Sequence, residues 1–354
     1  MRRVLGLACL SLAFAAPAAA QGVDQTCLLA LTRFDAGTVN VAFPDDSAQY
    51  WVGGYAALPG TRLRITGRFP HARYMSFNVY DPLMRPLDAI ADVAIAPDAG
   101  SANPFAPGAD RTVAKRSYTV FVQFGPKPAK PAPNTIYSGT GQNGTPNYAG
   151  TLIYRIYIPD KGRDEFGGTA IPTVQVEPSS ATGPLVESPC GTFSKPAISG
   201  INEALANANA IPGLDAVTPA PGRNPPRWRK FTNLVAAFGY GITDSARTDP
   251  IYQALRRLDL DTAGGSGGFL SNIDNAYVSA IVNRQLGQVV QTRFKPPTFP
   301  DTRPGVTRMP AAQLRYWSLC QNDSITQRFV ACLNDDRSVI GADGFATYVI
   351  SAPN

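Results

Sequence analysis

Residues 73–81 are Arg-Tyr-Met-Ser-Phe-Asn-Val-Tyr-Asp, and residues 315–323 are Arg-Tyr-Trp-Ser-Leu-Cys-Gln-Asn-Asp. Arginine, tyrosine, serine and aspartate recur at identical spacing in the two segments. The residues upstream agree, because an Arg-Phe pair at 68–69 is matched by an Arg-Phe pair at 293–294. An internal repeat of this kind predicts that one structural unit occurs twice along the chain.

The first copy lies within a series of short segments that alternate apolar and polar residues. Such alternation is typical of half-buried β-strands. The segments are 49–55, 62–69, 74–80, 118–124, 151–158 and 173–176 in the first half, and 277–282, 288–294, 314–320 and 345–351 in the second. Clusters of Gly, Pro and Asn separate them, notably at 126–134 and 139–147. The pattern predicts a mainly β protein with sandwich or jelly-roll-like sheets.

The stretch between the two β-rich parts has a different composition. Helical spacing or a high Pro and Gly content characterises residues 199–208, 212–226, 233–238 and 250–258. The chain of 354 residues also exceeds the usual size of one domain. We therefore expect two related β-sandwich modules, at 21–192 and 270–354, joined by a short helical, Pro/Gly-rich connector at 193–269.

The first twenty residues have the three parts of a secretory signal peptide. Arg2 and Arg3 are followed by an apolar run at 4–14 and by small residues up to Ala20. The run is too short to span a bilayer, which needs about 20 residues, and no later segment is long and apolar enough to be a transmembrane helix. We therefore expect cleavage near Ala20 and a secreted or periplasmic protein. Processing as a lipoprotein at Cys9 is the weaker alternative, because Cys9 lies inside the apolar run.

Cleavage would change both the net charge and the cysteine count. The net charge would fall from +6 to +4, because Arg2 and Arg3 are lost. Basic residues are scattered along the rest of the chain, so we expect no nucleic-acid partner. The cysteines that remain are Cys27, Cys190, Cys320 and Cys332.

An even number of cysteines in an exported protein predicts disulfides. Three pairings are possible for four cysteines. We favour Cys320 with Cys332, across a short hairpin-like loop, and Cys27 with Cys190, which would join the mature start to the end of the first half. The alternative of a zinc site lacks the CxxC spacing and the histidines that zinc usually requires.

Four motifs together resemble a family of secreted bacterial proteins of unknown function. They are Tyr-x-x-Gly-Gly-Tyr at 50–55, Ala-Arg-Tyr-x-Ser-Phe at 72–77, Pro-Asp-x-Gly-x-Asp-x-x-Gly-Gly at 159–168 and Arg-Tyr-Trp-Ser-Leu-Cys-Gln-Asn at 315–322. The resemblance covers most of the mature chain. It implies a β-sandwich and export, and it supplies no activity and no catalytic residues.

The repeated motif carries the best candidate site. On a strand, alternate residues share a face, so Tyr74, Ser76 and Asn78 lie opposite Arg73 and Asp81. A tyrosine ring can stack on a sugar, while serine and asparagine can hydrogen-bond its hydroxyl groups. The alternative is that Arg73 and Asp81 cap the two ends of a core strand.

The second copy of the motif offers the corresponding ligand-binding residues Tyr316, Ser318 and Asp323. These residues extend the same polar and aromatic character to a second strand. The sequence therefore predicts an exported protein that binds a glycan or another ligand of the cell envelope. An inert envelope scaffold is a further alternative.

An enzymatic alternative involves the single histidine of the chain, His71. Its ordinary pKa suits a general base, and we regard His71, Arg73, Tyr74 and Asp81 as the candidate catalytic residues. They would belong to a carbohydrate-active hydrolase or lyase outside the cytoplasm. Hydrolysis would need two carboxyl groups about 5–10 Å apart. The alternative for His71 is a surface turn between two strands.

A metal site is the remaining hypothesis. Asp160, Asp164 and Glu165 offer oxygen ligands for Ca²⁺ among glycines that permit tight turns. Lys161 and Arg163 could instead neutralise the acids in a structural turn. Glycine-rich strings elsewhere lack the strand and helix that cofactor motifs require, so we expect no other cofactor.

Overall fold

The structure is a computed structural model of the chain. It describes residues 43–56, 59–81, 85–141, 143–179, 270–284, 287–323 and 328–352, and short pieces at 33–34, 40, 225–226 and 228–230. The predicted signal peptide, Cys27, Cys190 and almost all of the predicted connector lie outside the described residues. Within the described residues the protein is mainly β, as the alternation predicts, and most of its strands pair antiparallel.

Two sheets form the first part of the chain. The larger has the spatial order β1 (Arg33–Phe34), β2 (Ala48–Ala56), β8 (Ala149–Pro159), β4 (Ala72–Tyr80) and β5 (Pro86–Ala91). The smaller has the order β7 (Thr135–Tyr137), β6 (Ser117–Gln123), β3 (Thr61–Arg68) and β9 (Thr173–Pro178). All of these pairs are antiparallel except β6 with β7.

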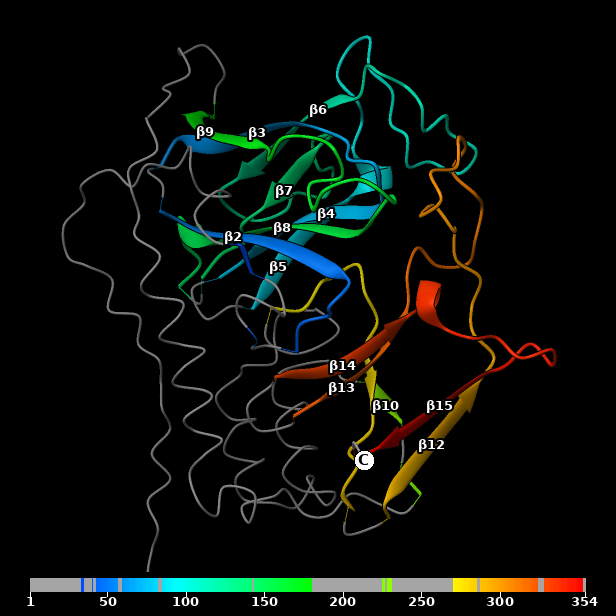
Figure 1. The fold of residues 1–354 in the computed structure, drawn as a ribbon. Coiled ribbons are helices and arrows are strands. Elements are labelled where there is room, and N and C mark those ends of the chain that lie inside the picture. Colours follow the sequence, from blue (N-terminus) through cyan, green and yellow to red (C-terminus); the bar gives the residue numbers. More distant parts are fainter. Residues whose placement is uncertain are drawn as a thin grey trace, which may run out of the picture.

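One hydrophobic core lies between these two sheets. Figure 1 shows the four-stranded sheet above the five-stranded sheet. Phe77 of β4 and Tyr118 of β6 meet in this core with ring centroids 5.9 Å apart, and both side chains are fully buried. The inner faces follow the alternation of the strands, so every second residue of β3, β4, β6 and β8 enters the core. The two sheets therefore pack over one shared hydrophobic core.

Strand β4 departs from the predicted pattern. All nine of its residues are buried, so the expectation of a half-buried strand is wrong here. One face of β4 packs into the core, and the other is covered by residues from the second part of the chain. Tyr74 on that second face contacts Asn272, for example.

The second part of the chain consists of two-stranded ladders in the described residues. These pair β10 (Arg229–Lys230) with β11 (Val278–Ser279), β12 (Val289–Phe294) with β15 (Ala346–Ser351), and β13 (Ser318–Asn322) with β14 (Phe329–Asn334). Two single-turn 3-10 helices are also described, η2 (Asp92–Ala94) and η5 (Asp335–Arg337). In Figure 1 the β13–β14 hairpin lies below the five-stranded sheet. The described residues of this part do not show the second β-sandwich module, which stays a prediction.

The repeat in the sequence corresponds to a repeat in connectivity. The series β3, β4, β5, η2, β6 has the same order and pairing as the series β12, β13, β14, η5, β15, because the first strand pairs with the last and the two middle strands form a hairpin. Phe69 packs on Tyr118 at 4.9 Å in the first series, and Phe294 stacks on Tyr348 at 5.7 Å in the second.

Strand boundaries differ most in the second copy. The alternation predicts a strand over 314–320, whereas β13 begins at Ser318. Arg315 and Tyr316 precede the strand, and their side chains reach the first half of the chain instead. The predicted strand at 277–282 is reduced to the two residues of β11.

Candidate ligand-binding site

The outer face of the five-stranded sheet carries a polar and aromatic surface. Since inner and outer residues alternate, β4 places Tyr74 and Ser76 on this face, and β8 places Arg155 and Tyr157 there. Arg155 lies on the central strand, opposite Tyr50 of β2 on one side and Ser76 of β4 on the other. The face thus brings together the Tyr and Ser predicted from the repeat with an arginine that sequence reasoning missed.

Arg155 is a buried cation with an incomplete set of partners. Its side chain is only 3% exposed. Nη2 donates hydrogen bonds to the Tyr80 hydroxyl at 2.7 Å and to the Leu270 carbonyl at 2.8 Å. The guanidinium also lies 5.6 Å from the ring centroids of both Tyr50 and Tyr80. Nη1 has no hydrogen-bond partner, and no carboxylate of the described residues lies within ion-pair distance of Arg155.

Two further polar atoms on the same side of the sheet lack partners. Asn78 donates from Nδ2 to Ser76 at 2.9 Å, but its Oδ1 accepts nothing, and Ser271 Oγ is also without a partner. Ser271 lies over this face, because its carbonyl accepts a hydrogen bond from Tyr80 at 2.9 Å. Each unsatisfied buried group costs about 1–3 kcal/mol. A charged donor, an acceptor and a hydroxyl are therefore available to a polar ligand at this face.

Tyrosine rings form the wall beside these groups. Tyr157 contacts Tyr74 and Tyr316, each with centroids 5.1 Å apart, and Tyr50 at 6.4 Å. Burial raises the pKa of Tyr74 and Tyr157 above the ordinary value. Both phenols therefore stay protonated at neutral pH and can donate hydrogen bonds.

Two arginines position the tyrosines, and each arginine pairs with an aspartate from the other copy of the repeated series. Arg73 of the first copy pairs with Asp335, which follows the second hairpin, and Arg315 of the second copy lies 3.4 Å from Asp92, which follows the first hairpin. The aspartates have equivalent roles, since Asp92 accepts from the Met75 N–H at 3.0 Å and Asp335 accepts from the Trp317 N–H at 3.1 Å. The residue after each arginine is a tyrosine of the wall.

The predicted ligand-binding residues of the second copy are held by Asp45. Tyr316 and Ser318 both donate to Asp45 Oδ2 at 2.6 Å. Burial raises the pKa of Asp45 even though these hydrogen bonds oppose the shift. Asp323 is separate from this group, because it lies at the turn of the β13–β14 hairpin, where its N–H donates to the Arg328 carbonyl.

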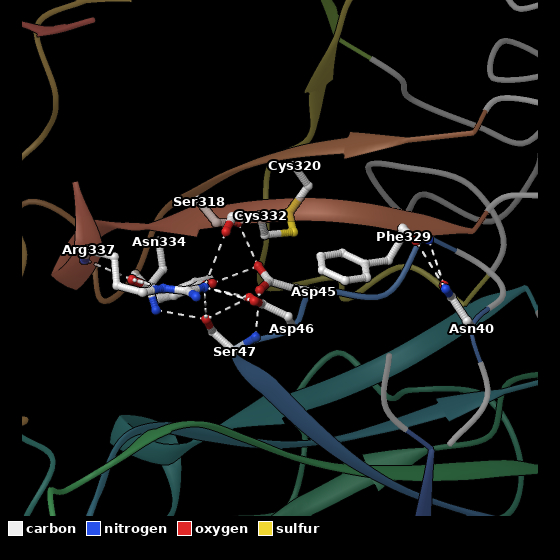
Figure 2. Close-up of a disulfide and its surroundings, with 11 residues drawn as sticks. Asn40, Asp45, Asp46, Ser47, Ser318, Cys320, Phe329, Cys332, Asn334 and Arg337 are labelled. Carbon is white, nitrogen blue, oxygen red and sulfur yellow. Dashed lines mark hydrogen bonds and ion pairs between the residues drawn. A yellow bond between two sulfur atoms is a disulfide. The ribbon is translucent and has the colours of Figure 1, made fainter. Parts of the chain in front are cut away.

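The disulfide predicted between Cys320 and Cys332 is confirmed, and it joins directly paired residues of β13 and β14. Figure 2 shows that the segment before β2 lies against this hairpin. Asn40 both donates to the Phe329 carbonyl and accepts from its N–H. Arg337 pairs with Asp46 at 2.8 Å. The hairpin therefore fixes the segment that carries Asp45.

The predicted catalytic residues do not form one site. His71 precedes β4 and Asp81 follows it, so about ten residues of extended chain, roughly 30 Å, separate them. Asp81 accepts from Arg85 at 2.6 Å and closes the turn to β5. Arg73 and Tyr74 point to opposite faces of β4. Burial and nearby arginines lower the pKa of His71 to about 4, which makes it a weak base.

The three predicted calcium ligands have separate partners. Asp160 binds Arg111 at 2.8 Å, Asp164 accepts from the N–H of Gly168 at 2.8 Å, and Glu165 lies 3.5 Å from Arg33. Over the part of the chain that the structure describes, the one group of metal-ligand side chains that converges is Asp45, Cys320 and Cys332. The two sulfurs of this group are bonded to each other. The Asp45 carboxylate is therefore its one remaining metal ligand.

Comparisons with known proteins add no function. No protein-family model matches the sequence, and no curated protein is similar to it. The chain has a distant likeness to an uncharacterised protein from Burkholderia cenocepacia, with 11% identity and a TM-score of 0.39, over 89% of this chain and 68% of that one. A protein from Vibrio parahaemolyticus is similar over 37% of this chain and 31% of its own, with 16% identity and a TM-score of 0.23. Likenesses at these scores carry no argument about this chain.

Proposed function

We propose that this protein binds a small polar ligand with an acidic group, such as an acidic sugar, at the outer face of the five-stranded sheet. The observation that carries the proposal is the buried Arg155, whose Nη1 lacks a partner. A carboxylate is the complement of a guanidinium, which can donate two parallel hydrogen bonds to it. Asn78 Oδ1 and Ser271 Oγ would pair with ligand hydroxyl groups.

The tyrosine wall supports a sugar as the class of ligand. Phenol rings offer an apolar surface for the sugar ring and a hydroxyl for its polar edge. Residues Leu270 and Ser271 cover the face through backbone carbonyls that accept from Arg155 and Tyr80. We expect this loop to open for the ligand and to close again over it, because its contacts are isolated hydrogen bonds rather than a strand ladder.

Binding is preferred over the hydrolase or lyase alternative. The predicted catalytic residues lie apart, and Asp45 already accepts hydrogen bonds from Tyr316 and Ser318. Glycoside hydrolysis needs two convergent carboxyl groups, and the proposed ligand contacts include none.

Action outside the cytoplasm is part of the same proposal. The signal-like first twenty residues and the disulfide support it, because disulfides persist mainly in oxidising compartments. Along the described part of the chain, no helix has the length and apolar character needed to cross a membrane. We also propose that the two copies of the repeated series derive from one duplicated module, on the ground of their shared connectivity.

The test compares matched acidic and neutral sugars. Isothermal titration with galacturonic acid and galactose, and with glucuronic acid and glucose, isolates the effect of the carboxylate. We expect the acids to bind and the neutral sugars to bind at least tenfold more weakly. Arg155→Gln should abolish the preference for the acid, and Arg155→Lys should weaken binding while keeping the preference.

The matched control is Arg62→Gln, which removes an arginine from the smaller sheet, where Arg62 pairs with Glu177. It should leave sugar binding unchanged. Circular dichroism checks that each variant is folded. Equal binding of acidic and neutral sugars, or an acid preference that survives Arg155→Gln in a folded protein, would overturn the proposal.

A further inference from the structure

A cluster of cationic side chains, separate from Arg155, lies at one end of the two packed sheets. Arg68 ends β3, Arg116 directly precedes β6, and His71 precedes β4. Arg111 comes from the loop before β6, and Arg163 comes from the loop after β8. Backbone hydrogen bonds tie these segments together, including Phe69 N–H to the Arg116 carbonyl at 2.9 Å and His71 N–H to the Gly167 carbonyl at 2.9 Å.

Arg116 is the buried centre of this cluster. Its side chain is only 2% exposed. Nη2 donates to the Arg111 carbonyl at 2.7 Å, whereas Nε and Nη1 have no hydrogen-bond partner. Among the described residues no carboxylate forms an ion pair with Arg116. A buried guanidinium with two free donors is unusual, because buried charges are normally paired.

Asp160 is the carboxylate that acts on the pKa of Arg116, but its oxygens already accept hydrogen bonds from another arginine. Arg111 Nη2 donates to both of its carboxylate oxygens, at 2.8 and 3.0 Å. The neighbouring acids Asp164 and Glu165 are directed to the backbone of their own loop and to Arg33. Asp110, beside Arg111, is an exposed carboxylate that accepts from Thr112 and also interacts with Arg116. Four arginine charges thus face Asp160 and the exposed Asp110, and a net positive charge remains.

The excess of positive charge also affects the pKa of two groups in the cluster. Burial, and then the charges of Arg111 and Arg68, lower the pKa of Arg116 to about 10. Burial, and then the charges of Arg116, Arg163, Arg111 and Arg68, lower the pKa of His71 to about 4. Both shifts are what an excess of nearby cations produces.

We propose that this cluster binds a phosphate group, with Arg116 as the buried anchor and the exposed Arg68 and Arg163 as outer contacts. A phosphate dianion suits the excess charge better than a singly charged carboxylate does. Its oxygens can accept a charge-assisted hydrogen bond from either free nitrogen of the Arg116 guanidinium. This site is separate from the outer face of the sheet, so it can be tested independently of sugar binding.

His71 provides the measurement, because it is the only histidine and its ring proton resonances are unique in an NMR spectrum. The full chain is titrated from pH 3.5 to 7.5 with and without inorganic phosphate, and with sodium chloride at equal ionic strength. Near pH 4 inorganic phosphate is mainly the monoanion, which still offsets part of the arginine charge. We therefore expect it to raise the pKa of His71 by about half a unit or more relative to chloride. A His71 titration that is the same in phosphate and in chloride would overturn the proposal.

Variants locate the phosphate. Arg163→Gln should weaken phosphate binding at least fivefold, and Arg116→Gln should abolish it if the variant folds. Lys130→Gln is the matched control, since it removes an exposed cation from the loop that follows the other end of β6. Unchanged phosphate affinity in Arg163→Gln would contradict the assignment. Glucose 6-phosphate distinguishes the source, because tighter binding than inorganic phosphate indicates a phosphate ester and equal binding indicates the free anion.

Discussion

Arg155 is the residue on which the proposed ligand binding depends, and its surroundings are unusual for a buried arginine. Tyrosine rings and carbonyl oxygens replace the carboxylate that normally pairs with such a side chain. A guanidinium stays charged at any physiological pH, so its free Nη1 cannot be relieved by loss of a proton. This is why the proposed ligand carries an acidic group.

Asp92 predicts how stability depends on pH. Burial raises the pKa of Asp92 to about 7, although Arg315 opposes the shift. Between about pH 4 and pH 7 the folded state therefore holds more protons at this residue than the unfolded state, so the contribution of Asp92 to stability falls as pH rises through that window. Asp92→Asn keeps an acceptor for Met75 and cannot ionise. Urea unfolding at several pH values should show a smaller loss of stability between pH 4.5 and 7.5 in the variant, and an identical slope would refute the shift.

The sequence predicts part of this site at the residue level. Alternation along 74–80 correctly places Tyr74 and Ser76 on one face and Arg73 on the other. It does not reveal that the face is covered, because Asn272 and Tyr316 come from segments about 200 residues or more away in the chain. Arg155 was missed because a single arginine within an apolar strand has no local signature.

At the level of elements, the β13–β14 hairpin is the support for Asp45. Its predicted disulfide was foreseeable from cysteine parity and spacing, whereas β14 itself was not predicted. Strand β5 was not predicted either, because it begins with proline and carries a weak strand signal. In both cases a neighbouring strand supplies the pairing that the local sequence does not indicate.

Removal of this disulfide should destabilise the protein measurably. The bridge closes a loop with a sequence separation of 12, and chain-entropy arguments give about 3 kcal/mol for a loop of this size. We expect the double variant Cys320→Ala, Cys332→Ala to fold and to lose stability of that order in urea unfolding. A loss below about 1 kcal/mol would show that the hairpin is held mainly by its hydrogen bonds to residues 40–47.

At the scale of the whole molecule, the exchanged arginines join the two copies of the motif. The repeat predicts that Arg73 and Arg315 are equivalent, and their structural roles agree. The exchange could not be predicted, because the partners Asp92 and Asp335 lie outside the repeated segment and each belongs to the other copy. Only the three-dimensional arrangement shows that each arginine pairs with the aspartate of the other copy.

Breaking one of these pairs should cost more than breaking a surface pair. Arg73 and Asp335 are fully buried, and loss of one partner of a buried pair costs about 3–5 kcal/mol. We expect Asp335→Asn to lie near the lower end, because Asp336 still pairs with Arg73 at 2.6 Å. The matched control is Asp343→Asn, which weakens the exposed pair with Arg293 and should leave the free energy of unfolding nearly unchanged. Similar losses of stability in the two variants would contradict the role of the exchange.

The most direct test of ligand binding at the outer face is a crystal structure of the full protein grown with galacturonic acid. We predict that a carboxylate oxygen lies within hydrogen-bond distance of Arg155 Nη1 and that the sugar ring lies against the tyrosine wall. A structure in which the sugar binds elsewhere, or in which Nη1 is hydrogen-bonded only to protein and water at a saturating sugar concentration, would contradict this prediction.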